Sequence, residues 1–213
     1  MHSSRSNTDC KWRRRKEARP AEIIDAALDL FVEKGFNATK LDDVARKAGV
    51  SKGTVYLYFE SKESLFREVV KQIIVPEVEK AENRAAEFVG SQSELLKSLM
   101  VNWWEVVGKT RLGGIPKLMV SEAANFPELA EFYLEKVVAR ARNLVVESIK
   151  KGVENGEFKQ CDPIVTARLF LAPVVFAVIW DKSLATYDKE DYDRDEYIRM
   201  HTNNFFDGLL QSK

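Results

Sequence analysis

The sequence has few of the features that mark secreted or membrane proteins. Its two cysteines, Cys10 and Cys161, are too few and too far apart for a disulfide scaffold, which favours a reducing compartment. No apolar stretch follows the N-terminal arginines, so no signal peptide is predicted. The most apolar run, residues 164–180, contains Pro173 and is shorter than the ~20 residues of a membrane span. We therefore expect a cytoplasmic protein with no membrane partner, in which this run forms a buried helix.

Catalytic signatures are also scarce. The chain has two histidines, His2 and His201, and it lacks a glycine-rich phosphate loop, a G-x-S-x-G motif and cysteines at metal-binding spacing. The acidic stretch 187–196 has aspartates at the spacing that opens a calcium loop. However, Glu196 stands where that loop needs glycine, and Thr202 stands where it needs glutamate. We expect no metal, no cofactor and no enzymatic activity.

The net charge is zero, yet the charges are unevenly distributed. Residues 1–72 contain 15 Lys and Arg against 11 Asp and Glu, a balance of +4, whereas residues 73–213 have a balance of −4. Basic segments are attracted to polyanions, so the front of the chain is the part expected to meet one. Residues 1–18 are polar and lack periodicity, and we expect a flexible basic arm that either contacts the polyanion or is simply solvated.

Apolar residues recur at helical spacing along almost the whole chain after residue 20, without an alternating strand pattern or an internal repeat. Proline, glycine and capping residues separate the periodic segments. The pattern predicts an all-α fold of about nine helices. The expected helices lie near residues 20–34, 39–48, 51–59, 61–88, 95–107, 115–124, 127–155, 163–180 and 195–210.

Capping residues refine the boundaries of the first helices. Thr39 is the expected N-cap of the second helix, with Asp42 completing a capping box. Ser51 and Ser61 are the expected N-caps of the third and fourth helices. Pro76 is expected to kink the long fourth helix, because proline has no N–H to donate and its ring crowds the preceding turn.

The segment AGVSKGTVYLYF, residues 48–59, is predicted to be helical although it is rich in poor helix formers. Two short helices joined at residues 48–51 match a helix-turn-helix, in which Gly49 supplies the positive φ of the turn. The inner positions of this unit are Val44, Val50, Val55 and Phe59. The outer positions are Lys52, Gly53, Thr54, Tyr56, Leu57 and Tyr58. A helical hairpin that only packs would not need such an outer face.

Several of these residues suit contact with the phosphates of DNA. Ser51 and the free N–H groups of the first helical turn favour a phosphate oxygen. Lys52 can reach a phosphate or a guanine, and the hydroxyl groups of Tyr56 and Tyr58 can bond phosphate oxygens. Helix propensity is therefore given up for a polar contact surface.

The remaining outer residues suit contact with bases. Gly53 lets the backbone approach closely, because it has no side chain. The methyl group of Thr54 and the side chain of Leu57 can touch a thymine methyl. The outer face thus combines phosphate contacts with base contacts, as a DNA-recognition helix requires.

The motif resembles the DNA-binding domain of TetR-type transcriptional regulators over about residues 20–66. The positions that carry the resemblance are Ala38-Thr39, Val44-Ala45, Ala48 to Thr54, Tyr56, Phe59 and Ser61 to Phe66. The resemblance implies an all-helical homodimer that binds a palindromic operator in double-stranded DNA and releases it when a small ligand binds. It also implies that Thr39, Lys52, Thr54, Tyr56 and Lys62 contact DNA. Members often have two adjacent aromatic residues where this chain has Tyr56-Leu57-Tyr58, so Leu57 is expected to alter base preference.

Three segments are therefore expected: the arm of residues 1–18, a helix-turn-helix domain of residues 19–66, and a helical ligand-binding and dimerisation domain of residues 67–213. The full set of predicted DNA contacts is Thr39, Lys40, Ser51, Lys52, Gly53, Thr54, Tyr56, Leu57, Tyr58 and Lys62.

Residues 111–131, RLGGIPKLMVSEAANFPELAE, resemble the middle of the ligand-binding domain in multidrug- and fatty-acid-related branches of that family. Large aromatic residues and methionine around few polar groups suit a concave apolar site, and ordinary core packing is the alternative. Glu122 either attracts a cationic ligand or faces solvent. The candidate ligand-binding residues are Trp103, Trp104, Val107, Leu118, Met119, Glu122, Phe126, Phe170, Val174 and Val178.

The last two helices are expected to form a four-helix contact between two copies of the chain. The candidate interface residues are Leu169, Ala172, Val175, Phe176, Ile179, Ile198, Phe205, Phe206 and Leu209. The function expected from the sequence is a DNA-binding repressor released by a small apolar or amphipathic effector. The alternative is a regulator of the same fold that responds to a protein partner instead.

Overall fold

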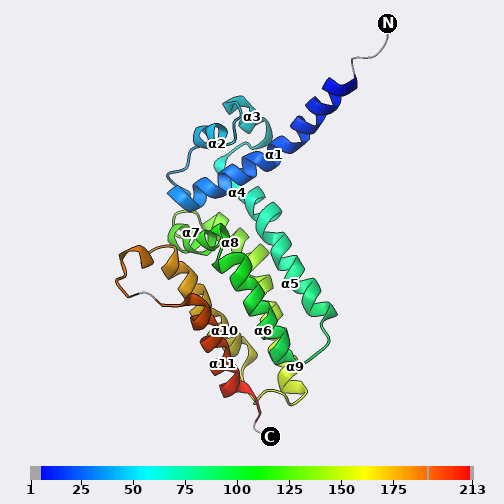
Figure 1. Cartoon of the computed structure of the whole chain (residues 1–213), viewed down its shortest axis with the longest axis vertical. Helices are drawn as coiled ribbons and strands as arrows, with labels where there is room; N and C mark the ends of the chain where they lie inside the picture. Colours follow the sequence, from blue (N-terminus) through cyan, green and yellow to red (C-terminus); the bar gives the residue numbers. More distant parts are fainter. Residues whose placement is uncertain (1–5, 191, 212–213) are drawn as a thin grey trace. The chain divides into compact units, whose positions relative to one another are not determined.

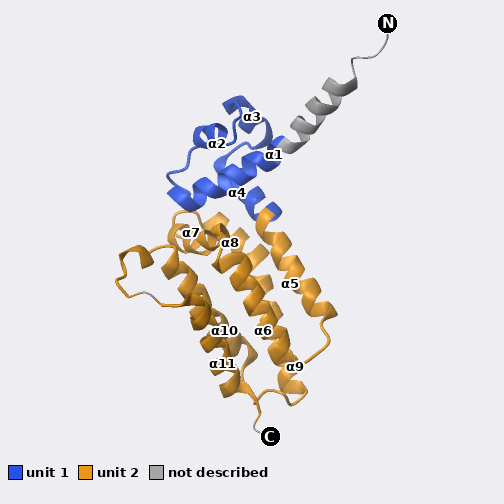
Figure 2. Ribbon diagram, in the orientation of Figure 1, with its two compact units in different colours: residues 1–72 blue, residues 73–213 orange. Residues whose placement is uncertain are grey.

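The computed structural model describes the backbone of residues 6–190 and 192–211, with side chains from residue 19 onward. Clustering of contacts divides the chain into two compact units, Met1–Gln72 and Ile73–Lys213, hereafter unit 1 and unit 2 (Figures 1 and 2). Within the described ranges both units are helical and hold no strand, which confirms the all-α prediction. The prediction of a flexible basic arm at residues 1–18 lies outside the residues whose side chains are described.

Unit 1 contains helices α1 (Ser6–Lys34), α2 (Leu41–Lys47), α3 (Lys52–Tyr58) and α4 (Lys62–Val69). Helix α1 packs on α2 and α4, and α2 packs on α3. Three fully buried aromatic rings form the centre of this small core. The ring centroids of Phe31, Phe36 and Phe66 lie 5.4–5.7 Å apart, which is the spacing of favourable aromatic pairs.

The predicted caps of α3 and α4 are confirmed, whereas that of α2 is wrong. The Ser51 hydroxyl accepts a bond from the Thr54 N–H, and Ser61 forms a reciprocal capping box with Ser64. Helix α2 instead has Lys40 at its N-cap without a side-chain bond. The hydroxyl of Thr39 is bonded back toward α1, to the carbonyl groups of Leu30 and Gly35 at 3.1 and 2.7 Å, so it cannot cap α2.

The predicted kink at Pro76 is a change of helical register. A π-helical turn, η1 (Val70–Ile74), precedes α5 (Val75–Glu87), and Pro76 lies in the first turn of α5. Proline offers no N–H to the carbonyl of Gln72, so a regular α-helical ladder cannot continue through this point. The boundary between the two units falls inside this π turn, between Gln72 and Ile73.

Unit 2 continues with a series of helices that pack around α9. Its remaining elements are α6 (Gln92–Trp103), η2 (Trp104–Gly108), η3 (Arg111–Gly113), α7 (Gly114–Glu122), α8 (Pro127–Tyr133), η4 (Leu134–Val138), α9 (Ala139–Glu154), α10 (Pro163–Asp181), η5 (Ala185–Tyr187) and α11 (Arg194–Leu209). Helices α5, α6 and α10 all pack on α9, and α11 packs on α6 and α10. The helix expected at 127–155 is thus divided by the π turn η4.

The core of unit 2 is large and rich in aromatic residues. Phe158, Phe170 and Phe206 are at most 1% exposed, and their ring centroids lie 5.7–6.0 Å apart where they pair. Gly152 makes room for this packing, because a Cβ atom there would lie 2.2 Å from the ring of Phe158. An isolated antiparallel bridge between Phe158 and Leu210 joins the loop after α9 to the end of α11.

Helix α10 begins near the predicted residue 163, after Asp162, whose carboxylate accepts bonds from the N–H groups of Ile164 and Val165. Among the described helices, α10 is long and apolar enough to cross a membrane by length and composition, with a mean hydropathy of 2.0. One third of that stretch is buried in unit 2. The remaining apolar residues of α10 therefore include an exposed face.

Candidate DNA-binding surface and effector site

The turn between α2 and α3 presents α3 with one buried and one exposed face. Gly49 has a φ of +66°, a conformation that favours glycine, and it allows the chain to reverse between the helices. Val55 is fully buried and Phe59 is 5% exposed, so they anchor α3 in unit 1. On the opposite side, Tyr56 is 47% exposed and Leu57 is 73% exposed. Such exposure of large apolar groups marks a surface available for contact.

Lys52 extends from this exposed face and is paired with a carboxylate. Its ammonium group lies 2.9 and 3.0 Å from the two carboxylate oxygens of Asp42, and 5.7 Å from the ring centre of Tyr56. The hydrogen bond to Asp42 raises the pKa of Lys52 above its ordinary value. Lys52 therefore stays protonated, but it must share its charge between Asp42 and any phosphate.

Gly53 and Thr54 differ in which of their atoms are already in contact with the rest of the protein. A Cβ atom at Gly53 would meet only the Ser51 hydroxyl oxygen at 3.9 Å, so nothing within the protein requires glycine here. The hydroxyl oxygens of Thr54 and Ser51 lie 2.8 Å apart within hydrogen-bond distance. The methyl group of Thr54 is consequently the part that remains for a base contact.

Two predicted DNA contacts have their polar groups turned toward the protein. Thr39 is 1% exposed, and its hydroxyl bonds only backbone carbonyl groups. The ammonium group of Lys62 donates to the carbonyl groups of Phe36 and Asn37 at 2.7 and 3.0 Å, and lies 4.6 Å from the ring centre of Phe36. Both side chains form hydrogen bonds to the backbone at or just before the loop after α1. Thr39 itself is buried and does not lie on the exposed surface. Lys40, at the N-cap of α2, is exposed.

Most of the candidate ligand-binding residues of unit 2 lie in or beside its core. Trp104, Phe170, Val174 and Val178 belong to one cluster of buried side chains, with Trp103 packed against it. The Trp104 ring N–H also donates to Asp195 at 2.7 Å. Leu118 and Met119 are buried as well, whereas Val107, Glu122 and Phe126 are only partly buried. Four of the ten candidates therefore lie together as core residues of unit 2.

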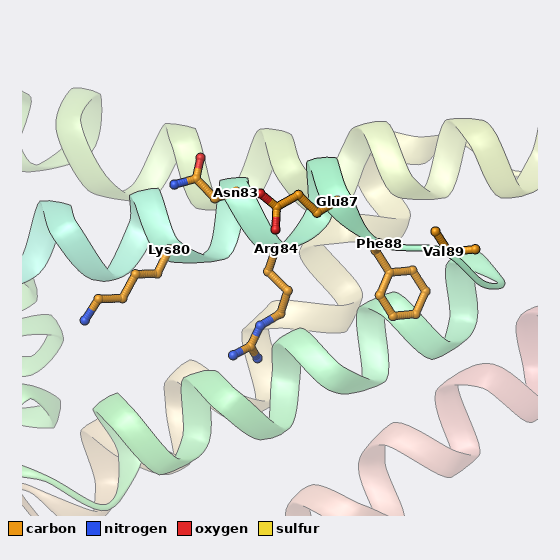
Figure 3. Close-up of a pocket in the computed structure, with 6 residues that line it drawn as sticks. All are labelled: Lys80, Asn83, Arg84, Glu87, Phe88 and Val89. Atoms are coloured by element: carbon orange, nitrogen blue, oxygen red, sulfur yellow. The ribbon is translucent and has the colours of Figure 1, made fainter.

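Two surface hollows in unit 2 are lined by residues that the sequence analysis did not select. One hollow of about 520 Å³ is lined by α5 and the residues after it (Figure 3), and the other, of about 460 Å³, is lined mainly by α6. Arg84 lines both. Charged residues on an amphipathic helix have the same pattern as an ordinary solvated face, so no sequence signal distinguished them.

The candidate interface residues are divided by the structure. On α10, Leu169 is 62% exposed and Phe176 is 59% exposed, and Ala172 between them is exposed. On α11, Ile198 and Phe206 are buried. Within the same set, Leu209 is also buried, and Val175, Ile179 and Phe205 are partly buried. The prediction that α11 contributes Ile198, Phe206 and Leu209 to an interface is wrong, because these residues fill the core of their own unit.

The fold and the exposed face of α3 define a helix-turn-helix protein with a separate helical unit. A family described as "Bacterial regulatory proteins, tetR family" matches residues 23–69, and one described as "AefR-like transcriptional repressor, C-terminal domain" matches residues 94–206. The chain belongs to the TetR family of transcriptional regulators.

Individual relatives support the same assignment. The HTH-type transcriptional regulator YfiR of Bacillus subtilis is 32% identical over 160 residues, which cover 73% of this chain and 76% of that protein. The fatty acid metabolism regulator protein of Bacillus subtilis is 25% identical over 182 residues, covering 84% and 90%. The crystal structure of the transcriptional regulator FadR from Bacillus subtilis in complex with stearoyl-CoA has a TM-score of 0.73 at 20% identity, covering 88% and 98%. This last likeness establishes a shared fold.

Proposed function

We propose that the chain is a cytoplasmic repressor that binds a palindromic operator as a homodimer and is released by a small apolar or amphipathic effector. The observation that carries the proposal is the exposed face of α3, where a lysine, a glycine and two large side chains surround a well-formed N-cap. Helix propensity and core packing do not account for these residues. Contact with DNA does.

In the proposed complex, α3 lies in the major groove of the operator. The hydroxyl group of Tyr56 and the ammonium group of Lys52 bind phosphates, while Gly53 lets the helix approach the bases. The methyl group of Thr54 and the side chain of Leu57 contact base edges. A dimer places its two α3 helices about one helical turn of DNA apart (~34 Å), which matches a palindrome.

The proposed dimer forms through α10. Val165, Leu169, Ala172 and Phe176 follow one another at helical spacing and are all exposed. An exposed apolar stripe of this kind is typical of a surface that another protein covers. A second copy of α10 would cover it in a symmetric contact, without the buried residues of α11.

The effector is proposed to bind unit 2 and to oppose DNA binding. The FadR relative was crystallised with stearoyl-CoA, an amphipathic molecule, which supports this class of effector for the present chain. If the effector favours a conformation that binds DNA poorly, operator DNA must weaken effector binding by the same factor.

The first experiment measures binding of the purified protein to DNA flanking its own coding region, by fluorescence anisotropy over a salt series, with random DNA of equal length as a control. We expect a strong preference for one palindromic site and a steep salt dependence. Replacing Tyr56 with Phe should weaken binding to every sequence, whereas replacing Thr54 with Ala should change the preference at particular bases. Failure to bind any DNA at low salt would rule out the proposal.

A regulator that responds to a protein partner is the second candidate. It is favoured by the core packing of Trp104, Phe170, Val174 and Val178, which fills the region where an internal ligand was expected. Organic extraction of the purified protein, followed by mass spectrometry, distinguishes the two. A bound small molecule supports the effector, and operator release by a purified protein alone supports the partner.

A further inference from the structure

The smaller hollow forms a groove between α5 and α6, because it is lined by Arg84 of α5 and by residues of α6. Each helix packs on α9, and these two fully described helices make few contacts with each other. Helix α5 is fastened to α9 by Arg140, whose guanidinium donates to both carboxylate oxygens of Glu82 at 2.9 and 2.6 Å. A bidentate pair of this kind fixes orientation as well as distance. The helices on either side of the groove, α5 and α6, therefore both pack on the same helix, α9.

The two surface hollows meet in this groove at Arg84. The larger hollow, about 520 Å³, is lined by Arg84 and residues of α5 and the loop after it, and the smaller, about 460 Å³, adds Lys97 and Val101 from α6. In Figure 3, Arg84 and Phe88 extend from the same side of α5. Both hollows are shallow and open to solvent.

The cationic groups of the groove differ in whether they already have a carboxylate partner. Lys80 pairs with Glu77 at 2.6 Å, and the acidic Glu105 of the smaller hollow pairs at 2.7 Å with Lys109, which also pairs with Asp195 at 2.8 Å. Among the residues the structure describes, no ion pair is formed by Arg84.

Lys97, in the smaller hollow, forms no ion pair within the described chain, although it interacts electrostatically with Glu94, and its ammonium group lies 5.3 Å from the ring centre of Phe206. Ser98 and Asn102 add neutral hydrogen-bonding groups, and Glu87 is the one acidic side chain of the larger hollow. Each hollow is thus lined by two cationic side chains and one carboxylate.

The larger hollow supplies an apolar surface. Phe88 and Val89 line its end, and Val89 is 96% exposed. This end of the hollow requires glycine at position 90, because Gly90 has a φ of +154° and a Cβ atom there would lie 2.8 Å from the ring of Phe88. On the α6 side, Val101 is 55% exposed. An exposed apolar patch beside unpaired cations fits a molecule with a tail and an anionic head.

We propose that the α5–α6 groove binds a small anionic amphiphile, with its carboxylate or phosphate head at Arg84 and Lys97 and its apolar tail against Phe88 and Val89. The site is thereby on the surface of unit 2 and not among the packed core residues. The assignment of this groove as the effector site rests on the proposed function above.

Decanoate is a suitable probe, because it carries one carboxylate and a tail short enough for the two hollows. Binding is measured by isothermal titration calorimetry on the full chain, with decan-1-ol and decyltrimethylammonium as neutral and cationic counterparts. We expect decanoate to bind and both counterparts to bind at least tenfold more weakly. Arg84→Gln and Lys97→Gln should each weaken decanoate binding about tenfold, since each removes a charge-assisted hydrogen bond.

Three variants control for charge and folding. Lys151→Gln removes an exposed lysine of α9 outside the groove and should leave decanoate binding unchanged. Arg84→Lys keeps the charge and should restore part of the affinity. Val101→Glu places a carboxylate in the smaller hollow and should abolish binding. Circular dichroism melts confirm that each variant folds.

The outcomes separate the groove from the proposed function. Equal binding of decanoate by wild type, Arg84→Gln and Lys97→Gln would overturn the proposed site, as would no binding by wild type at 1 mM or equal binding of decan-1-ol. Operator binding is measured in parallel without decanoate and should be the same for all variants. A wild-type protein that bound decanoate through Arg84 but bound no DNA would support the groove and overturn the repressor.

Discussion

The two units differ in how their residues divide between packing and contact. In unit 1, four residues selected for DNA contact, Lys52, Gly53, Tyr56 and Leu57, are exposed on α3, and the unit has a separate aromatic core. In unit 2, Trp104 and Phe170 were selected for ligand contact and are core residues. Polar and conformationally unusual residues therefore mark a binding surface more reliably than apolar residues, because every core also needs the latter.

The largest expected effect tests the assignment of Phe170 to the core. Phe170→Ala should lower the free energy of unfolding by about 3–5 kcal/mol, because it removes a fully buried ring and leaves a cavity. Urea denaturation followed by tryptophan fluorescence measures the loss, since three of the four tryptophans lie in unit 2. Leu57→Ala, at the exposed face of α3, should change stability by less than about 0.5 kcal/mol. Comparable losses of unfolding free energy in both variants would contradict the assignment of Phe170 to the core and Leu57 to the surface.

The second effect concerns Tyr133, a partly buried tyrosine of unit 2. Burial raises the pKa of Tyr133 above its ordinary value of 10.0, so the folded protein holds the phenolic proton more tightly than the unfolded chain. The resulting stabilisation is complete below about pH 10 and is lost as the pH rises, by at most about 1.4 kcal/mol per unit. Tyr133→Phe should flatten this alkaline decline in urea titrations at pH 9–11.5. Leu57→Ala, on the exposed face of α3, removes no titratable group and is the control, which should leave the decline unchanged.

The third effect separates stability from DNA affinity at one position. Gly53→Ala should stabilise unit 1 by about 0.5–1 kcal/mol, because alanine favours the helix and its Cβ atom meets only an ordinary contact. The same methyl group should weaken operator binding about tenfold by keeping α3 away from DNA. Thermal melts and fluorescence anisotropy measure the two quantities.

Gly49→Ala is the matched control for that substitution. Gly49 has a positive φ that alanine adopts with strain, so this variant should destabilise the protein. If Gly53→Ala bound the operator as tightly as wild type, the close approach assigned to Gly53 would be wrong.

The smallest effect concerns the partner of Lys52. Asp42→Asn should raise the affinity for DNA about threefold, because it frees Lys52 and removes a negative charge close to the phosphates. Stability should change little, since exposed ion pairs contribute little. Fluorescence anisotropy at low salt measures the gain, with Glu22→Gln, an exposed acidic residue of α1, as the control. Weaker binding by Asp42→Asn would mean that the ion pair positions Lys52 for DNA.

Local signals in the sequence predicted the helices and several of their ends. The caps Ser51 and Ser61 are predictable from the sequence, because a cap depends on hydrogen bonds to N–H groups two or three residues away. The sequence pattern wrongly predicts that Thr39 caps α2, because its hydroxyl in fact bonds the carbonyl of Leu30, nine residues earlier in the chain. A pattern within one turn cannot reveal such a partner.

The exposed face of α10 and the groove beside α5 could be predicted only in part. The sequence predicts a buried helix at residues 164–180, yet packing against α9 and α7 leaves Leu169 and Phe176 of α10 exposed. The groove gave no sequence signal, because it depends on two helices that lie on a third without closing on each other. Arg84, which lines both hollows, looks like any charged residue of an amphipathic helix.

The sequence by itself determined the all-helical fold, the helix-turn-helix and the surface that α3 presents, because these follow from periodicity, caps and residue types close together in the chain. Only the tertiary structure decided which apolar faces are core and which are exposed, and that Lys62 holds a loop of its own unit. The reason is physical. An apolar stripe on a helix has the same pattern whether another helix, a ligand or a second copy covers it, and only packing distinguishes them.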